Sequence, residues 1–344
     1  MERGIGMEIF IAGSSRSGTT LVSRILGRHD RVHTLPELHF FEEIWRHGQG
    51  SATVGADHID AVAELLATAE GGYLRRHDPA MYRTQARSIV EGEPQAEPAA
   101  TLRDLYFRVL HIQAEQNGAS VPCEHTPQNV FYIDEILDAS PRARIIAMVR
   151  DPRDVVLSQR SKWRRWYLSE GAFPRREAVR AALTYHPINV ALLWRAAARS
   201  LQAGSADPRV LVVRYEDLVA DAEATTVKMC DFLELDWSAN LLNVERHGSS
   251  RSRDNADTSG VRDDRSSAWR RASSRERADV VISQRLCRAQ MAAYGYDAAR
   301  LKVPWGRLAW QLASWPVRSL LGLLLNLLRV GSPFRAIRVR LKAK

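Results

Sequence analysis

The stretch that most constrains the fold is residues 8–37, EIFIAGSSRSGTTLVSRILGRHDRVHTLPE. Its apolar run at 9–12 predicts a buried strand, and the spacing of apolar residues after the turn predicts an amphipathic helix. Between them lies a tight segment bounded by Gly13 and Gly18. A strand, a glycine-bounded turn and a helix start form an anion site, because free backbone N–H groups and the positive end of the helix dipole point the same way.

The turn carries the cluster Arg16, Ser17, Gly18, Thr19 and Thr20, whose guanidinium and hydroxyl groups can bind phosphate oxygens. The glycine spacing fits the nucleotide P-loop, G-x-x-x-x-G-K-[ST], but Thr19 occupies the place of the lysine that reaches the β/γ-phosphates. This difference argues against hydrolysis of ATP or GTP. An ordinary strand-to-helix turn is the alternative, and it explains the glycines but not the cluster.

A second pattern of the same kind follows the apolar run at 145–149, which predicts a strand covered on both faces. The run ends in Arg150, and Pro152 suits the first turn of a helix. Taken alone, Arg150 can simply pair with Asp151 or Asp154. Two anion motifs at strand ends favour a ligand instead, because ligands of parallel sheets bind outside the carboxyl ends of the strands.

The sequence RSGTT after a first strand resembles the 5′-phosphosulfate loop of sulfotransferases that use 3′-phosphoadenosine-5′-phosphosulfate, PAPS. The branch with the protein-tyrosine sulfotransferases and many bacterial relatives also has a catalytic glutamate at the spacing of Glu37. In this family a strand-end arginine and a helix serine bind the 3′-phosphate, and Arg150 and Ser158 match them, with Lys162 placed to add charge. The resemblance covers residues 8–296 and implies a three-layer, P-loop-like α/β fold with a central parallel sheet.

Three further residues are implied by the resemblance. The RYEDL segment is a recurrent family element, in which Tyr215 packs near the adenine or forms a structural corner. The family closes its cofactor site with a loop ending in Ser-x-Trp, here Ser267 to Trp269, whose serine is expected to stabilise the bridging oxygen; a charged linker is the alternative. Relatives have Glu-Lys-Thr-Pro where this chain reads EHTP, and the family's lysine is expected to reach the sulfuryl group. Either His125 takes over this role, as an imidazolium or as a neutral N–H donor, or another cation such as Arg16 does.

The function implied is transfer of a sulfuryl group from PAPS to a hydroxyl acceptor, a sugar, lipid, phenol or tyrosine, with PAP as product. Glu37 is expected to be the general base, and His33 and His39 are its rivals. No metal is expected, because the sequence has no ligand cluster. The competing interpretations are a P-loop nucleotide kinase or NTPase, and a basic membrane- or nucleic-acid-binding protein. No nucleic-acid motif is visible, so we expect no nucleic-acid partner.

The 344 residues carry a net charge of +9, which fits an anionic cofactor, nucleic acid or an anionic membrane. The cysteines, Cys123, Cys230 and Cys287, are odd in number and far apart, which argues against a disulfide framework or a metal site. The charged first residues do not resemble a signal peptide. We therefore expect a cytoplasmic protein, while the oligomeric state stays open.

We expect a sulfotransferase domain over residues 1–300 and a basic, Trp- and Leu-rich amphipathic segment over residues 301–344. Pro316 and Pro333 are expected to interrupt any single helix in this segment. The leucine run at 319–328 is too short for a transmembrane helix, which needs about 20 residues. Two interpretations remain: an interfacial segment on an anionic membrane, or a face that packs on the protein or on a second subunit.

Alternating helices and apolar runs along the chain favour a parallel α/β sheet. Further strands are expected at 31–34, 121–124 and 210–213. Helices are expected at 38–46, 57–70, 102–116, 128–137, 175–201, 222–233 and 275–294. Residues 71–100 are expected to form an irregular insertion, and residues 246–275 a long loop.

Overall fold

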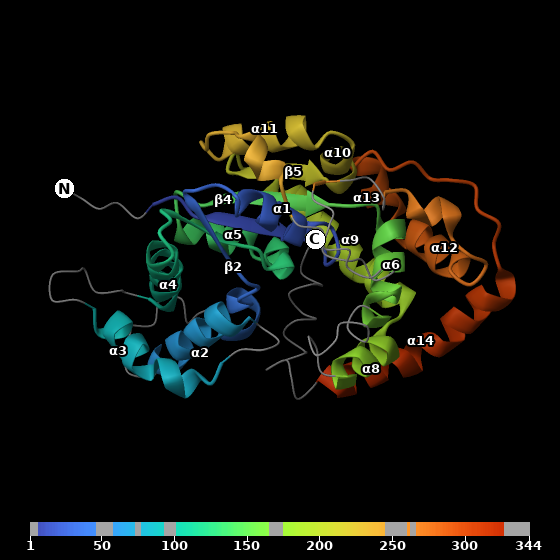
Figure 1. Ribbon diagram of the computed structural model, residues 1–344. Coiled ribbons are helices and arrows are strands. Elements are labelled where there is room, and N and C mark those ends of the chain that lie inside the picture. Colours follow the sequence, from blue (N-terminus) through green and yellow to red (C-terminus); the bar gives the residue numbers. More distant parts are fainter. Residues whose placement is uncertain are drawn as a thin grey trace.

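The computed structural model describes residues 6–45, 58–72, 77–92, 101–164, 175–244, 260–261 and 266–326. Its centre is a five-stranded parallel sheet with the order β2-β3-β1-β4-β5 (Figure 1). The strands are β1 (Ile9–Gly13), β2 (Val32–Leu35), β3 (Val121–Glu124), β4 (Arg144–Val149) and β5 (Val210–Arg214). All five lie at the predicted places. β1 and β4 are continuous apolar runs, as expected for strands buried on both faces, whereas β2 (VHTL) and β3 (VPCE) are mixed in sequence.

Alternate side chains of each strand point to opposite faces of the sheet and build two separate cores. Phe10 and Ile145 belong to one core, and Ile9 and Ile146 belong to the other. The first core is covered by α4 (Leu102–Gln116), α5 (Ile133–Ala139) and α9 (Pro187–Gly204), the second by α1 (Thr19–Leu26), α10 (Tyr215–Ala220) and α11 (Ala222–Phe232). The predicted three-layer, P-loop-like α/β fold is therefore confirmed.

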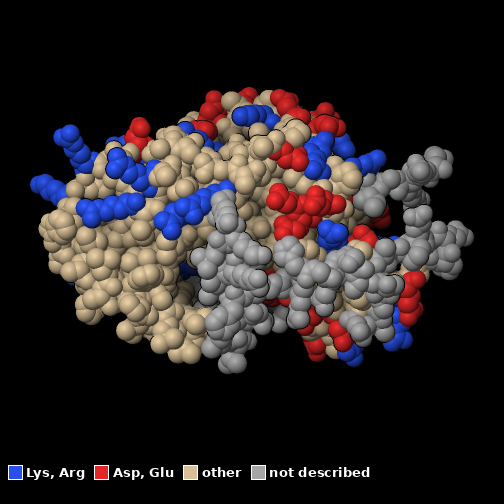
Figure 2. Space-filling model, turned by 180° about the vertical axis from the view of Figure 1, so that it is seen from behind, with Lys and Arg blue, Asp and Glu red and all other residues tan. Residues whose placement is uncertain are grey.

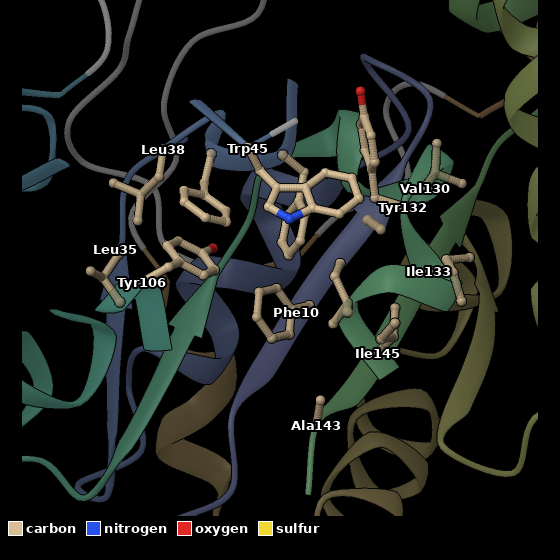
Figure 3. Packing of buried hydrophobic residues seen from close by; sticks show 14 of the residues in the cluster. Phe10, Leu35, Leu38, Trp45, Tyr106, Val130, Tyr132, Ile133, Ala143 and Ile145 are labelled. Carbon is tan, nitrogen blue, oxygen red and sulfur yellow. The ribbon is translucent and has the colours of Figure 1, made fainter. Parts of the chain in front are cut away.

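Aromatic side chains anchor the segment that follows β2 (Figure 3). This segment contains η1 (Phe40–Ile44), a π-helical turn that is shorter than the predicted helix. Phe40 stacks on Tyr106 of α4 with ring centroids 4.0 Å apart, and Phe41 lies 5.8 Å from the ring of Tyr132. Stacked ring contacts of this kind stabilise the packing beyond the burial of area alone. The chain is therefore held firmly just after Glu37.

The remaining elements are helices and short helical turns outside the sheet, and they correct several of the predicted helices and loops. They are α2 (His58–Gly71), η2 (Pro79–Tyr82), α3 (Arg83–Glu91), η3 (Pro127–Phe131), α6 (Pro152–Arg160), α8 (Arg175–Thr184), η4 (Ala239–Leu242), η5 (Ala268–Arg271), α12 (Arg277–Leu286), α13 (Arg288–Ala293) and α14 (Trp305–Asn326). The region 71–100 is not wholly irregular, because α3 buries Ala86 and Ile89 against the core. The helix predicted at 175–201 divides at Pro187, which disfavours a helical conformation of the residue before it. Most of the loop predicted at 246–275 lies outside the described residues.

The helix α14 runs through Pro316, so the prediction that this proline interrupts the helix is wrong. A proline inside a helix removes the hydrogen bond to the carbonyl four residues earlier, here that of Leu312. Both Pro316 and Leu312 are exposed, so water can solvate that carbonyl. Pro333 lies outside the described residues. None of the described helices is both long and apolar enough to span a bilayer.

Candidate active site

The loop between β1 and α1 has the backbone of an anion-binding nest. Arg16 has a left-handed φ of 75°, unusual for a residue with a side chain, and Gly18 has a φ of 104°. No side chain caps α1 at Gly18, so the N–H groups of its first turn stay directed at the loop. Ser17 and Thr19 are buried, and Thr20 is exposed. The backbone conformation thus fits the expected phosphate loop.

The two predicted anion motifs meet in space, because β1 and β4 are neighbours in the sheet. The guanidinium of Arg16 donates from Nε to Ser158 Oγ at 3.0 Å. The guanidinium of Arg150 donates from Nη1 to the carbonyl oxygen of Arg16 at 3.3 Å. Residues about 140 positions apart in the sequence therefore form one cationic and hydroxyl-rich site, as expected for adjacent carboxyl ends of parallel strands.

Arg150 is held by aromatic side chains. Its guanidinium carbon lies 4.1 Å from the ring centroid of Tyr215, and its carbonyl oxygen accepts a hydrogen bond from Trp194 Nε1 at 2.9 Å. The neighbouring carboxylate of Asp151 pairs with Arg153, with Nη2 and Oδ2 separated by 2.7 Å. Tyr215 therefore positions Arg150, and its expected place near the adenine stays a prediction. The sequence gives no sign of the part played by Trp194.

The start of α6 also holds the turn that contains Ser267. Asp154 Oδ1 accepts a hydrogen bond from the backbone N–H of Trp269 at 2.8 Å. Burial raises the pKa of Asp154 to about 7, although the positive charge of Arg150 opposes this change. Arg153 lies over the ring of Trp269, 3.7 Å from its centroid. Ser267 is exposed with a φ of 54°, and its contact with a bridging oxygen stays a prediction.

Glu37 forms an ion pair with a buried histidine. His39 Nε2 lies 3.3 Å from Glu37 Oε2, and His39 Nδ1 lies 3.3 Å from Glu42 Oε2. Burial acts to lower the pKa of His39, but the hydrogen bonds and charges of the two carboxylates outweigh it and raise this pKa to about 10. Burial acts to raise the pKa of Glu37, but the His39 hydrogen bond and charge, with the charges of His125 and Lys162, leave it lowered. His39 is thus an imidazolium at neutral pH, and Glu37 is a carboxylate.

His125 is oriented by the end of β2. Its Nδ1 lies 2.7 Å from the carbonyl oxygen of Leu35 and 3.3 Å from Ser23 Oγ. A carbonyl oxygen only accepts, so Nδ1 carries the hydrogen. In the neutral ring Nε2 then holds a lone pair, and it donates only when the ring is protonated. Only the imidazolium form would therefore have a ring N–H left to offer to a ligand.

A buried carboxylate that sequence reasoning did not select, Glu124, organises the base. Its Oε1 accepts from the backbone N–H groups of Leu38 and Thr126, each at 3.1 Å, and from the Thr126 hydroxyl, while Asn129 donates to Oε2. Burial raises the pKa of Glu124 despite these bonds. The Thr126 hydroxyl accepts from the N–H of His39 at 3.2 Å. Glu124 thus ties the backbone just after Glu37 to the end of β3. The sequence signal that could have identified Glu124 is an acidic residue at the end of an apolar strand.

The remaining candidate base and the cysteines lie elsewhere. His33 lies on β2, and its pKa is lowered by burial, against the charge of Glu70 on α2. Cys123, Cys230 and Cys287 are buried free thiols. Within the described ranges, no group of three or more His, Cys, Asp and Glu side chains has an arrangement suited to a metal ion.

The family model of the sulfotransferase family matches residues 8–239, and the chain belongs to this family. The sulfotransferase domain of the Synechococcus PCC 7002 olefin synthase is 22% identical over 86% of this chain and 96% of its own, with a TM-score of 0.46. A sulfotransferase from Alicyclobacillus acidocaldarius is 17% identical over 83% and 97%, with a TM-score of 0.38. Retinol dehydratase in complex with androsterone and the inactive cofactor PAP is 16% identical over 86% and 82%, with a TM-score of 0.36. No curated protein matches.

Proposed function

We propose that this sulfotransferase uses PAPS as donor and transfers its sulfuryl group to a hydroxyl acceptor. The observation that carries the proposal is the hydrogen bond between Arg16 and Ser158, which joins the loop after β1 to the helix after β4. PAPS carries a phosphosulfate on the 5′ position of its ribose and a phosphate on the 3′ position, so its site needs hydrogen-bond donors at two separate places. The guanidinium groups of Arg16 and Arg150, the hydroxyls of the loop and the uncapped N-terminus of α1 are a donor set that suits such a polyanion.

Each residue of this donor set has a proposed part. Arg16 and the N–H groups of the loop hold the phosphosulfate, and the hydroxyls of Thr19 and Thr20 add donors in the first turn of α1. Arg150 and Ser158 hold the 3′-phosphate, with Tyr215 fixing the guanidinium. PAPS supplies a sulfuryl group already activated by its phosphate leaving group. The protein therefore contributes position and fixed positive charge, which are the main sources of catalysis in related group transfers.

Glu37 is the proposed general base. Its side chain is 39% exposed, so an acceptor hydroxyl can reach it, whereas His39 is only 7% exposed. At neutral pH His39 already carries its proton and cannot accept another, but its charge and hydrogen bond orient the Glu37 carboxylate. Lys162 and His125 add positive charge beside this carboxylate. We propose that His125 acts as a cation towards the sulfuryl group, and that Ser267 stabilises the bridging oxygen.

Comparative mass spectrometry tests the function and finds the acceptor. Extracts of cells that express the protein are compared with extracts of cells that express Glu37→Gln, which keeps the shape of the side chain and removes the proton acceptor. We expect sugars, lipids, phenols or tyrosine peptides that gain the mass of one sulfuryl group only with the parent protein. In vitro turnover of Glu37→Gln should fall about 10²–10⁴-fold with PAP binding retained. Equal sulfation by both proteins would contradict the role of Glu37.

A further inference from the structure

The side of α14 that faces the rest of the protein carries polar groups beside the buried Leu308. Gln311 is buried, and its Nε2 donates to Asp279 Oδ1 at 2.8 Å. One turn further, Trp315 Nε1 donates to Asn189 Oδ1 at 2.7 Å, and Ser319 also contacts this amide. The polar groups of α14 are therefore used to fasten the helix to the rest of the protein.

The opposite side of α14 is apolar and exposed. Its large side chains with their exposed fractions are Trp305 (69%), Trp310 (63%), Leu312 (55%), Val317 (70%), Leu320 (57%) and Leu324 (53%). Single exposed apolar residues are ordinary, but a helix of a soluble domain normally turns its polar side to water. A row of this length along one helix marks an interaction surface.

The net positive charge of the chain is concentrated in residues 305–344, which begin with α14 and continue beyond the described residues. Residues 305–344 contain eight Lys and Arg and no Asp or Glu, so they carry eight of the nine net positive charges. Figure 2 shows, on the side of the molecule where α14 lies, a broad region free of charged side chains with basic side chains along its upper edge. An apolar helix face followed by a strongly basic segment is complementary to a layer that has an apolar interior and anionic groups at its surface.

We propose that α14 lies on an anionic phospholipid bilayer with its apolar face at the acyl boundary, and that the positive charge of residues 305–344 strengthens the binding by attraction to the anionic headgroups. Tryptophan is enriched at this boundary, and amphipathic helices with basic flanks bind there by apolar burial and by attraction to anionic lipids. A second copy of the chain fits less well, because pairing would bring two +8 segments together. Membrane binding of this kind does not depend on the reaction proposed above.

The attachment of α14 also relates the bilayer to the active site. Asp279, which accepts from Gln311, also accepts from Arg160 Nη1 at 2.6 Å. Arg160 lies at the end of α6, two residues after Ser158 of the proposed 3′-phosphate site. A bilayer bound to α14 would therefore hold the active site in a fixed orientation to the membrane surface.

Vesicle co-sedimentation of the full chain tests the proposal. The vesicles are phosphatidylcholine alone or mixed in equal parts with phosphatidylglycerol. We expect binding to the anionic vesicles only, weakened by high salt. The double variant Val317→Ser, Leu320→Ser should bind at least about tenfold more weakly, since it removes apolar burial. Replacing Arg335, Arg338 and Arg340 by Gln should weaken binding on the order of 10²-fold.

The matched control is Met81→Ser, which removes an apolar side chain that is 73% exposed on η2, away from α14. It should bind the anionic vesicles as the parent does, and all variants should melt at the parent temperature. The proposal is overturned if the parent binds neither vesicle, or if the α14 variants bind as well as the parent. It is also overturned if the double variant turns a dimer into a monomer in size-exclusion chromatography while no protein binds vesicles.

Discussion

Replacing His39 by Gln tests the charged pair that orients the proposed base. His39 is 7% exposed and lies between the carboxylates of Glu37 and Glu42 at 3.3 Å from each. Burial opposes its charge, but the two carboxylates raise its pKa to about 10, from an ordinary value of 6.5. The folded state therefore binds this proton more tightly than the unfolded chain, which corresponds to an upper limit of about 5 kcal/mol of stability.

The sign of the pH dependence follows from the raised pKa. The stabilisation is fully present below pH 6.5 and is lost as the pH rises through about 10. Between about pH 6.5 and about pH 9.5 the parent should lose about 3–4 kcal/mol from this group. His39→Gln keeps a hydrogen-bond donor without the charge, so its stability should lack this loss.

Urea denaturation of both proteins at several pH values measures the effect, and the difference between them isolates His39 from other titrating groups. In the variant the pKa of Glu37 should also rise, because the imidazolium charge that lowers it is gone. The onset of activity on the acid side should therefore move to higher pH. Parallel stability curves for parent and variant would show that His39 is not charged in the folded protein.

Three further changes probe the donor site and the cation beside the base. Arg150→Ala should weaken the binding of PAP by about 2–3 kcal/mol, measured by calorimetry. Arg83→Ala, which removes an exposed arginine of α3, should leave PAP binding unchanged. His125→Ala should lower turnover at every pH, and His125→Lys should remove any decline of turnover at alkaline pH, because lysine keeps its charge there. An alanine variant as active as the parent from about pH 6 to about pH 9 refutes the role. Gly18→Ala should abolish PAP binding, because φ is 104° and the new Cβ would lie 2.7 Å from the Tyr215 ring; normal binding would contradict the loop geometry.

The strands, the loop after β1 and the start of α6 could be predicted from the sequence because their signals are local. A buried parallel strand is a continuous apolar run, and the turn after β1 needs glycine where φ is positive, as at Gly18. The rule that ligands bind outside the carboxyl ends of parallel strands placed both anion motifs at one edge of the sheet, whereas the contact of Arg16 with Ser158 also requires that β1 and β4 are neighbours.

The parts that could not be predicted depend on tertiary contacts. The charge of His39 arises from two carboxylates and burial, none of which a single histidine in a sequence reveals. The use of Glu124 as an anchor depends on the N–H of Leu38, 86 positions away. The continuation of α14 through Pro316 depends on which side of the helix faces water. Spacing rules describe none of these.

Calorimetry of the full chain with PAP and with ATP, both without magnesium, tests the central claim most directly, since it needs no acceptor. Arg150 and Ser158 should have a phosphate partner in PAP and lack it in ATP, which has no 3′-phosphate. We expect PAP to bind at one site about 10²-fold more tightly than ATP, the scale of one charge-assisted phosphate contact. Equal affinity for the two nucleotides would contradict a PAPS site built from the loop after β1 and the start of α6.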